Sequence, residues 1–337
     1  MAFLGWMRGR SEAANNLGAD VLLIATSRMD MLVERMGHYV GGERMRLAID
    51  AGGEPARGGT QTILVERQAL GSLIGASDVN KAFARKPGKR LAVELDLKHR
   101  SQRETVVSEN VLGYIEGSDK KDELIVLTAH YDHIGVEDGE VYNGADDDGS
   151  GTVAIMAIAK AFAAAKAAGH GPRRSVLVMP VSAEEKGLLG SQYYSERPVF
   201  PLANTVANLN IDMIGRVDSA HAASPPYVYI IGSDRLSTAL HAVNEAANEA
   251  HVGLVLDYTF NAEDDPNRFY YRSDHYNFAR KGVPAIFYFS GVHEDYHGPG
   301  DTLDKIKFDL LQQRALLVFH TAWELANREE RIAVDRP

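Results

Sequence analysis

From about residue 104 onward, short apolar runs that favour strands alternate with stretches in which apolar residues recur at helical spacing. Such alternation is typical of a sheet whose strands are mostly parallel and whose two faces are covered by helices. We predict strands over 124–128, 175–181, 205–211, 227–231, 254–258 and 285–289, and helices over 151–168, 188–196, 234–250 and 308–327. The sequence therefore predicts an α/β domain over residues 104–337, with a mixed, mostly parallel central sheet flanked by helices.

The first hundred residues have a different pattern, in which glycines separate short apolar runs. Strands are expected over 62–66 and 91–97, with one helix before Gly18 and another over 68–74. Residues 1–103 are therefore expected to form a smaller, β-rich unit ahead of the α/β domain.

Composition narrows the class of protein. The net charge is −10 and acidic and basic residues are mixed along the 337-residue chain, so a basic stripe for nucleic acid is missing and we expect no nucleic-acid partner. The absence of cysteine excludes disulfides, thiolate metal ligands and a cysteine nucleophile. Residues 1–10 lack the apolar stretch of a signal peptide, and the most apolar later stretch, 154–168, is interrupted by Lys160 and Lys166. We therefore expect no membrane segment.

Side chains that bind metals gather in five short segments, in the order His, Asp, Glu, Asp, His, and each segment ends or follows a predicted strand. Nitrogen and carboxylate ligands without thiolate suit a hydrolytic zinc site, and a carboxylate that can bridge suggests two metals. An open α/β sheet binds its ligand beyond the carboxyl ends of its strands. His130, Glu184, Glu185 and Asp212 each follow such an end, so we expect them to meet at one edge of the sheet.

As an ordered set, these segments resemble those of the co-catalytic di-zinc aminopeptidases of bacteria, which are relatives of glutamate carboxypeptidase II and glutaminyl cyclase. The resemblance covers about residues 104–328, and residues 13 to about 100 resemble the later part of a protease-associated domain. It implies a metallopeptidase with two Zn²⁺ ions per chain, a peptide substrate and a secreted or periplasmic natural protein. The segments are Ala129-His130-Tyr131-Asp132-His133, Gly144-Ala145-Asp146-Asp147-Asp148-Gly149-Ser150-Gly151, Ala183-Glu184-Glu185, Asn210-Ile211-Asp212-Met213-Ile214-Gly215 and Tyr296-His297-Gly298-Pro299-Gly300-Asp301-Thr302.

The resemblance also implies a ligand set. His130, Asp146 and Asp212 would bind one zinc, and Asp146, Glu185 and His297 would bind the other. Asp146 is then the bridging carboxylate, which lets two repelling cations coexist at a short distance.

Four further residues receive roles. Asp132 is expected to orient the imidazole of His130 by accepting its second N–H. Glu184 resembles the general base, which takes a proton from the metal-bridging water and passes it to the leaving amine. Tyr296 matches a tyrosine that binds the oxyanion in some relatives, and a packing role is the open alternative. Arg272 belongs to a segment that resembles the wall near the substrate amino group.

Two expectations concern backbone direction near the ligands. His133 is expected not to bind metal, because on an extended segment its side chain does not share a face with that of His130. The resemblance further implies a cis peptide bond between Asp146 and Asp147.

Other residues are expected near the site without touching the metals. Asp301 and Thr302 should brace the loop of His297. The aromatic residues Phe260 and 269–271 are close enough in sequence to Arg272 to line a side-chain pocket, with the core as the alternative location.

The expected activity is removal of N-terminal residues from peptides, with a weak preference for apolar ones. A carboxypeptidase of the glutamate carboxypeptidase type would need an arginine cluster for the substrate carboxylate, and none is evident. A glutaminyl cyclase-like transferase uses one zinc, whereas His130 and Glu185 both occupy their two-metal places. An inactive binding module would have lost ligands, and none is missing. An endopeptidase ranks last.

Overall fold

The computed structural model describes residues 2–32, 45–48, 59–75, 96, 104–224 and 226–336. The chain divides into two compact units, residues 1–105 and 106–337, and each is described by itself. This division lies two residues after the expected boundary between 103 and 104. Apart from Asp96, the strand expected over 91–97 lies outside the described residues.

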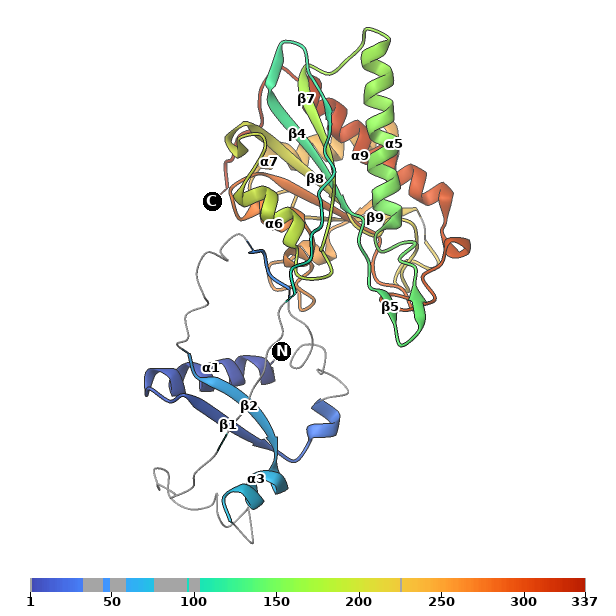
Figure 1. Ribbon diagram of the computed structural model, residues 1–337. Helices are drawn as coiled ribbons and strands as arrows, with labels where there is room; N and C mark the ends of the chain where they lie inside the picture. The colour runs from blue at the N-terminus through green and yellow to red at the C-terminus, as the bar shows by residue number, and fades with distance from the viewer. Residues whose placement is uncertain are drawn as a thin grey trace. The chain divides into compact units, whose positions relative to one another are not determined.

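The described residues of the first unit include helices α1 and α3 and a pair of parallel strands (Figure 1). Strands β1 and β2 pair in parallel from Val21 opposite Gln61. The carboxylate of Glu66 accepts the N–H groups of Gln68 and Ala69 and so caps the second helix. The helix before Gly18, the strand over 62–66 and the helix over 68–74 are thus confirmed. The elements are α1 (Ala2–Asn16), β1 (Val21–Thr26), β2 (Gln61–Glu66) and α3 (Arg67–Leu73).

The second unit is built on one mixed sheet, which within the described residues has seven strands in the order β10-β9-β11-β8-β4-β7-β3. The four central strands β11, β8, β4 and β7 are parallel to one another, whereas β9 and β3 run antiparallel to their neighbours β11 and β7. The predicted mixed, mostly parallel sheet is confirmed. The strands are β3 (Gly113–Ile115), β4 (Lys120–His130), β7 (Arg174–Val181), β8 (Thr205–Ile211), β9 (Tyr227–Ile231), β10 (Val255–Asp257) and β11 (Ala285–Phe289).

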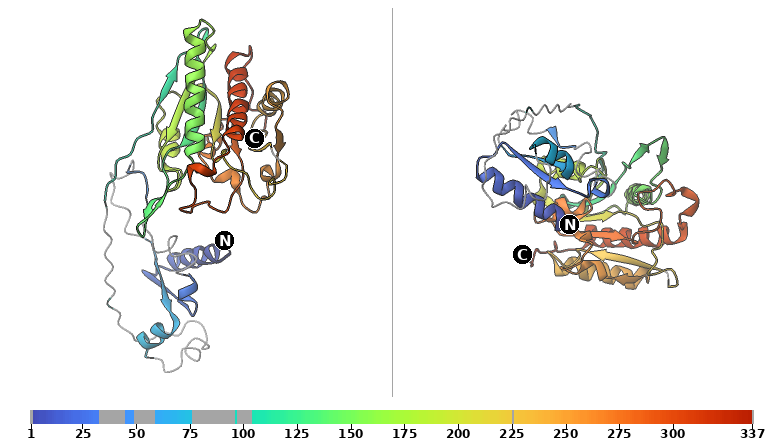
Figure 2. Two further views of the ribbon diagram at one scale, coloured as in Figure 1. Left: turned by 90° about the vertical axis from the view of Figure 1, so that its right-hand side faces the viewer. Right: turned by 90° about the horizontal axis from the view of Figure 1, so that it is seen from below.

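Helices cover both faces of this sheet, as predicted. Helices α5, α7 and α9 pack together on one face, where α5 and α9 run side by side (Figures 1 and 2). Ile125 and Leu127 of β4 point into that layer, while Leu124 and Val126 point into the opposite layer with α6 and α8, because successive strand residues alternate between faces. The helices are α5 (Gly149–Ala167), α6 (Leu189–Glu196), α7 (Thr238–His251), α8 (His275–Ala279) and α9 (Phe308–Asn327).

Helix α5 is, by length and composition alone, apolar enough to cross a membrane, and it is the one such helix in the described part of the chain. Ile155, Ile158 and Phe162 on its inner face are buried against the sheet. A helix that covers a sheet passes the same test of composition as a membrane span.

Some elements differ from the expectation or were not expected. Helix α7 begins at Thr238, because the hydroxyl of Ser237 accepts the N–H of Leu240 and caps the helix there. The hairpin of β5 (Gly135–Glu137) and β6 (Glu140–Tyr142) turns at Asp138 and Gly139, both at positive φ. Such a turn favours an Asp-Gly pair, which is a hairpin signal that the sequence contains. Strand β3, helix α8 and the 3₁₀ turns η2 (Leu202–Asn204), η3 (Thr259–Asn261), η4 (Phe269–Tyr271) and η5 (Leu303–Lys305) were likewise not expected.

Candidate active site

The candidate site lies where the four central parallel strands end. His130 is the last residue of β4, Glu184 and Glu185 follow β7, Asp212 directly follows β8, and His297 lies in the loop after β11. Because these strands are neighbours and point the same way, their carboxyl ends meet at one edge. The loops expected to carry the site are therefore brought together.

Asp147, in the turn before α5, lies between the two histidines. Its Oδ1 is 3.1 Å from Nε2 of His130, and its Oδ2 is 3.3 Å from Nε2 of His297. One carboxylate thus faces two nitrogen ligands, which is the arrangement expected of a bridging residue. The side chain is almost fully buried, so its position is fixed by the surrounding turn.

Asp146 does not occupy the bridging place that the sequence analysis gave it. Its Oδ1 accepts the N–H of Gly215 at 2.6 Å, and its Oδ2 faces the ring of His293 at 3.4 Å. The cis peptide bond also lies one residue later than expected, between Asp147 and Asp148. Both corrections have one cause: consecutive residues of a tight turn point in different directions, and three aspartates in a row do not reveal which one points inward.

The remaining ligand candidates form two groups, one at each oxygen of Asp147. Asp212 Oδ1 lies 3.7 Å from His130 Nε2 in the first group. Glu185 Oε2 lies 3.2 Å from His297 Nε2 in the second. The spacing suits two ions that share Asp147.

His133 was expected to stay clear of the metals, yet its ring belongs to the second group. Its Nδ1 is 3.1 Å from Oε1 of Glu185 and 4.0 Å from Oδ2 of Asp147. The expectation relied on the alternation of an extended strand, but β4 ends at His130, so alternation does not apply beyond it. His133 can orient Glu185 or bind metal itself.

The donor atoms fit zinc. Nδ1 of His130 lies 2.9 Å from the carbonyl oxygen of Asp132, which can only accept, so Nδ1 carries the proton and the lone pair of Nε2 faces the carboxylates. Nε2 of His130 and Oδ2 of Asp147 are buried and have no hydrogen-bond partner among the described residues. A bound cation with nitrogen and oxygen ligands would satisfy these lone pairs.

Asp132 acts on the site differently from the expectation. Its backbone carbonyl orients His130, whereas its carboxylate Oδ1 is 3.8 Å from that ring. The carboxylate accepts the N–H groups of Glu184 and Glu185, at 3.1 and 3.3 Å. Asp132 therefore fixes the loop that carries the expected base and one ligand.

Two more buried acids hold the backbone of ligand loops in the same way. Asp148 accepts the N–H of His130 at 3.1 Å, and Asp301 accepts the N–H groups of Asp146 and Asp147 at 3.0 to 3.1 Å. The sequence analysis expected Asp301 to brace the loop of His297; its carboxylate instead braces the turn of Asp147. Hydrogen bonds to a carboxylate are about twice as strong as neutral ones.

A ladder of polar side chains lies beneath the site and was not foreseen. Thr128 donates to Asn210 at 2.6 Å across β4 and β8, and Asn210 donates to Ser273 at 2.8 Å. Ser273 in turn hydrogen-bonds to Asp212 and lowers its pKa, although burial, the larger effect, leaves that pKa raised. The signal available in the sequence was Asn at inward positions of an otherwise apolar strand.

The charges of the second group depend on one another. Burial lowers the pKa of His297, but hydrogen bonds to Asp147 and Glu185 outweigh it and raise the pKa to about 9. Burial raises the pKa of Glu185, but hydrogen bonds from His133 and His297 outweigh it and lower the pKa to about 2. Without metal, protons therefore hold these groups together, and a cation must displace them.

A pocket opens beside the two groups. Glu184, Asp147 and Asp212 are the acidic residues of its lining. Burial is the main cause that raises the pKa of Glu184 well above its ordinary value, so this carboxylate binds a proton readily. The apolar part of the lining consists of Met213, Phe269, Phe287, Phe289 and Val292. Of the aromatics expected here, Phe269 lines the pocket, and Phe260 packs on it at a ring distance of 4.7 Å.

Tyr296 and Arg272 lie together at this pocket. Arg272 Nη2 donates to the hydroxyl of Tyr296 at 3.1 Å, and its guanidinium lies 4.7 Å over the ring of Phe269. Tyr296 also stacks on His297, with ring centroids 3.9 Å apart. Burial and the nearby Asp147 raise the pKa of Tyr296, so its hydroxyl stays protonated and can donate a hydrogen bond.

A second cavity, of about 610 Å³, lies at the opposite edge of the sheet, where β8 begins at Thr205 and β11 follows Pro284. Its charged lining residues are Lys281 and Arg331, and no His, Asp or Glu lines it. Hydrolytic metal chemistry therefore belongs to the edge with His130.

Comparisons with known proteins agree with this geometry. The profile of Peptidase family M28 matches residues 110–322. A probable zinc metalloprotease of Pyrenophora tritici-repentis is 29% identical over 259 residues, which is 66% of this chain and 52% of the relative. The chain thus spans about half the length of the first curated relatives it matches.

Solved structures give the same picture. BSAP, a zinc aminopeptidase from Bacillus subtilis, is 25% identical with a TM-score of 0.52, over 68% of this chain and 53% of that one. An aminopeptidase from Aneurinibacillus sp. strain AM-1 is 20% identical with a TM-score of 0.56, over 97% of this chain and 68% of that one. The second likeness supports the fold alone.

Proposed function

Because the chain belongs to Peptidase family M28, we propose that it is a di-zinc aminopeptidase that removes N-terminal residues from peptides. The observation that carries the proposal is the position of Asp147, whose two oxygens each face a different histidine, while Asp212 lies beside one of these histidines and Glu185 beside the other. The relatives named zinc metalloprotease and zinc aminopeptidase support the class of enzyme and the metal.

We assign His130, Asp212 and Asp147 to one zinc, and His297, Glu185 and Asp147 to the other. This keeps the ligands expected from the sequence except that Asp147 replaces Asp146. When bound, the two ions would polarise an attacking water molecule and the carbonyl group of the scissile bond.

Glu184 is assigned as the general base. It lines the pocket together with Asp147 and Asp212. Its raised pKa suits a carboxylate that must take a proton from water and hand it to the leaving amine. The N–H of Glu184 bonded to Asp132 holds the residue in place for both transfers.

Tyr296 is assigned to the oxyanion. Its hydroxyl can donate to the oxygen of the scissile carbonyl as charge develops there, and Arg272 holds the hydroxyl from the other side. Preorganised donors of this kind contribute about 10²–10³ in kcat. The apolar residues of the pocket, Phe269 and Met213 among them, favour an apolar side chain on the residue that is removed.

Charge favours attack from the N-terminus. The acids Glu184 and Asp212 line the pocket and can attract a substrate ammonium. A carboxypeptidase would need a cationic clamp, but Arg272 is the single arginine or lysine among the residues that line the pocket, and it already bonds Tyr296. Another nearby arginine, Arg216, is occupied by Glu294 and Asp295.

One peptide offered in three forms tests the proposal. The zinc-loaded protein is incubated with the free peptide, its N-acetylated form and its C-amidated form, and products are followed by mass. We expect acetylation to abolish cleavage and amidation to leave it unchanged, with the Glu184→Gln protein as a control for contaminating peptidases. The reverse pattern would support the carboxypeptidase, and equal cleavage of all three would support an endopeptidase. No cleavage by zinc-loaded protein would favour the binding module.

Other expectations rest on the resemblance. Three of these stay predictions: that residues 1–105 are related to part of a protease-associated domain, that the natural protein is exported, and that it has no nucleic-acid partner. Fractionation of the producing cells would test export, because an enzyme found only in the cytosol would contradict it.

A further inference from the structure

His297 is the ligand whose position depends most on its loop. Its side chain is 40% exposed, whereas that of His130 is 1% exposed. Its backbone lies at positive φ, in a loop rather than at a strand end. The imidazole packs on the ring of Tyr296, which lies in the same loop, so the residues that anchor residues 290–301 must fix both.

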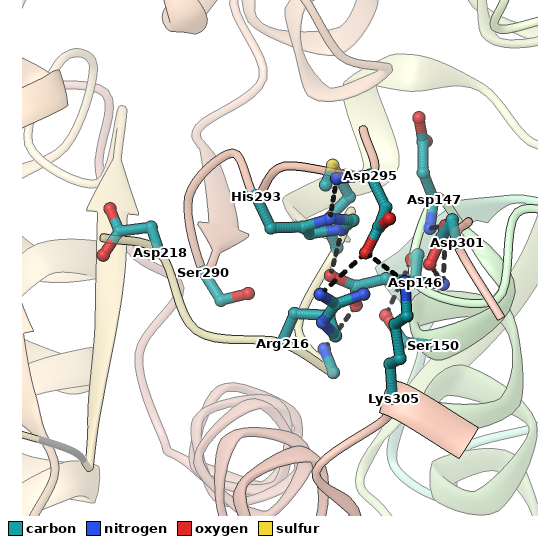
Figure 3. A network of polar contacts seen from close by, with 12 residues as sticks. Asp146, Asp147, Ser150, Arg216, Asp218, Ser290, His293, Asp295, Asp301 and Lys305 are labelled. Atoms are coloured by element: carbon teal, nitrogen blue, oxygen red, sulfur yellow. Dashed lines mark hydrogen bonds and ion pairs between the residues drawn. The ribbon is translucent and has the colours of Figure 1, made fainter. Parts of the chain in front are cut away.

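One anchor of this loop is electrostatic. Asp295 Oδ2 meets Nζ of Lys305 at 2.8 Å and Nη2 of Arg216 at 3.1 Å (Figure 3). The carbonyl of Asp295 also accepts the N–H of Gly298 at 2.8 Å. A side chain at Gly300 would collide with Asp295, since its Cβ would lie 2.2 Å from Oδ1. These contacts hold the outer half of the loop.

The inner anchor is His293, which lies four residues before His297. The side chain of His293 is fully buried. Its Nδ1 accepts the N–H of Asp295 at 3.2 Å, so in the neutral ring the proton is on Nε2. Nε2 faces Oδ2 of Asp146 at 3.4 Å (Figure 3), and neither atom has another hydrogen-bond partner among the described residues. Nε2 of His293 and Oδ2 of Asp146 are thus each other's polar partners.

Asp146 carries this contact to the bridging ligand. It directly precedes Asp147, and its own N–H is bonded to Asp301. Its Oδ1 accepts the N–H of Gly215, in the loop that follows Asp212. The contact between Asp146 and His293 thus joins the loop of His297 to the turn of Asp147. This loop and this turn each supply one ligand of the second zinc site.

We propose that His293 is a positioning residue for the second zinc: through Asp146 it fixes the separation between Asp147 and His297. The inference rests on the proposed function. The first site should depend far less on His293, because two of its three ligands, His130 and Asp212, end or directly follow central strands of the sheet. His293 itself does not line the pocket and so does not touch substrate.

Two substitutions distinguish the effect of the Nε2–H donor of His293 from the effect of the volume of its ring. His293→Gln keeps a donor near the place of Nε2, whereas His293→Leu fills the space without one. His320→Leu is the matched control, since His320 lies on α9 and stacks on His251 far along the chain from any ligand. Thermal unfolding of the metal-free proteins shows whether each variant is folded.

The measurement is zinc titration of the metal-free proteins in competition with a chromophoric chelator, with cobalt(II) absorption as a second readout. We expect the wild type and the His320→Leu protein to bind two ions. His293→Leu should keep the affinity of one site and lose about 10- to 100-fold at the other, the usual effect of losing a residue that orients a ligand. His293→Gln should recover most of that loss, and turnover of His293→Leu should recover at high zinc.

The outcomes separate the two claims. Fewer than two ions on the wild type would contradict the proposed function. Two ions on the wild type, with unchanged or equally weakened sites in His293→Leu, would overturn the role of His293 alone. A Gln variant no better than the Leu variant would also overturn it, because the packing of the ring and not its N–H would then be responsible.

Discussion

Replacing Asp147 by Asn should weaken metal binding far more than replacing Asp146 by Asn, although the two residues are neighbours in one turn. Asp147 offers one oxygen to each histidine, at 3.1 and 3.3 Å. Asn keeps one oxygen and replaces the other by an NH₂ group, which has no lone pair for a metal. One zinc would lose a ligand, and both would lose a shared negative charge.

The size of the effect follows from the charges. Two unit charges 4 Å apart interact by about 4 kcal/mol at an effective dielectric constant of about 20, so a divalent ion loses up to about 8 kcal/mol. The neutral Asn side chain also avoids the desolvation penalty of a buried carboxylate, which offsets part of this lost attraction. A net loss of about 4 kcal/mol corresponds to about a 10³-fold weaker site. Asp146 contacts Gly215 and His293 instead, so Asp146→Asn should weaken zinc binding by about 10- to 100-fold.

The assay compares Asp147→Asn, Asp146→Asn and a control, Asp138→Asn, at the exposed tip of the β5–β6 hairpin. Each metal-free protein is titrated with zinc against a chelator, and turnover is measured at one fixed zinc concentration. The control should match the wild type. If Asp146→Asn loses an ion while Asp147→Asn keeps both, the assignment of the bridge from this structure is refuted.

Three further outcomes are expected. Glu184→Gln should keep both zinc ions and lower kcat by about 10²–10⁴, as steady-state kinetics and metal analysis would show. In metal-free protein, Glu185 and His297 should stabilise the fold most between pH 4.5 and 6.5. The pKa of Glu185 is lowered to about 2 in the folded protein, so Glu185 stabilises the fold above its unfolded pKa of 4.5, and this stabilisation is lost as the pH falls toward 2. The pKa of His297 is raised to about 9, so His297 stabilises the fold below its unfolded pKa of 6.5, and this stabilisation is lost as the pH rises toward 9. Arg314→Leu should lower the free energy of unfolding in urea by about 3–5 kcal/mol, because each carbonyl left without a donor costs about 1–3 kcal/mol. Arg314 is buried and donates to the carbonyl oxygens of Tyr227, Ile214 and Arg216.

Each expectation has a contradicting result. Near-normal turnover of Glu184→Gln would move the base elsewhere. A stability maximum outside that pH window in the presence of a chelator would show that Glu185 and His297 are not coupled in the folded state. For Arg314, the control is Arg280→Leu, whose exposed side chain meets Glu196 at 3.5 Å and should matter little. Equal losses for the two arginines would contradict the role of burial.

The strands that carry the site were predictable because each is a run of apolar residues buried on both faces and followed at once by a polar segment. Thr205–Ile211 and Ala285–Phe289 are fully buried along their length, and their bounds match the prediction. Long buried runs leave little ambiguity in pattern, and parallel order then places their ends together. Most of the ligand loops could be foreseen from the sequence for this reason.

What could not be foreseen is the direction of side chains in turns. The choice between Asp146 and Asp147 depends on φ and ψ angles over two residues, and both are aspartate. His133 lies past the end of β4, where no periodic pattern governs which way a side chain points. His293 carries no local motif, and its contact spans from residue 293 back to residue 146. Such long-range pairs follow from the packed fold and not from any segment alone.

The acidic residues of the site divide into two kinds by what their oxygens contact. Asp147 and Glu185 direct their oxygens at histidine nitrogens, whereas Asp132, Asp148 and Asp301 direct theirs at backbone N–H groups of the ligand loops. The second kind needs no metal to be satisfied, so the loops can take their places before any ion binds. Without metal, the ligands instead retain protons that a cation must displace, as the raised pKa of His297 shows. The fold therefore prepares the geometry in advance and leaves the charge of the site to be balanced by the cations.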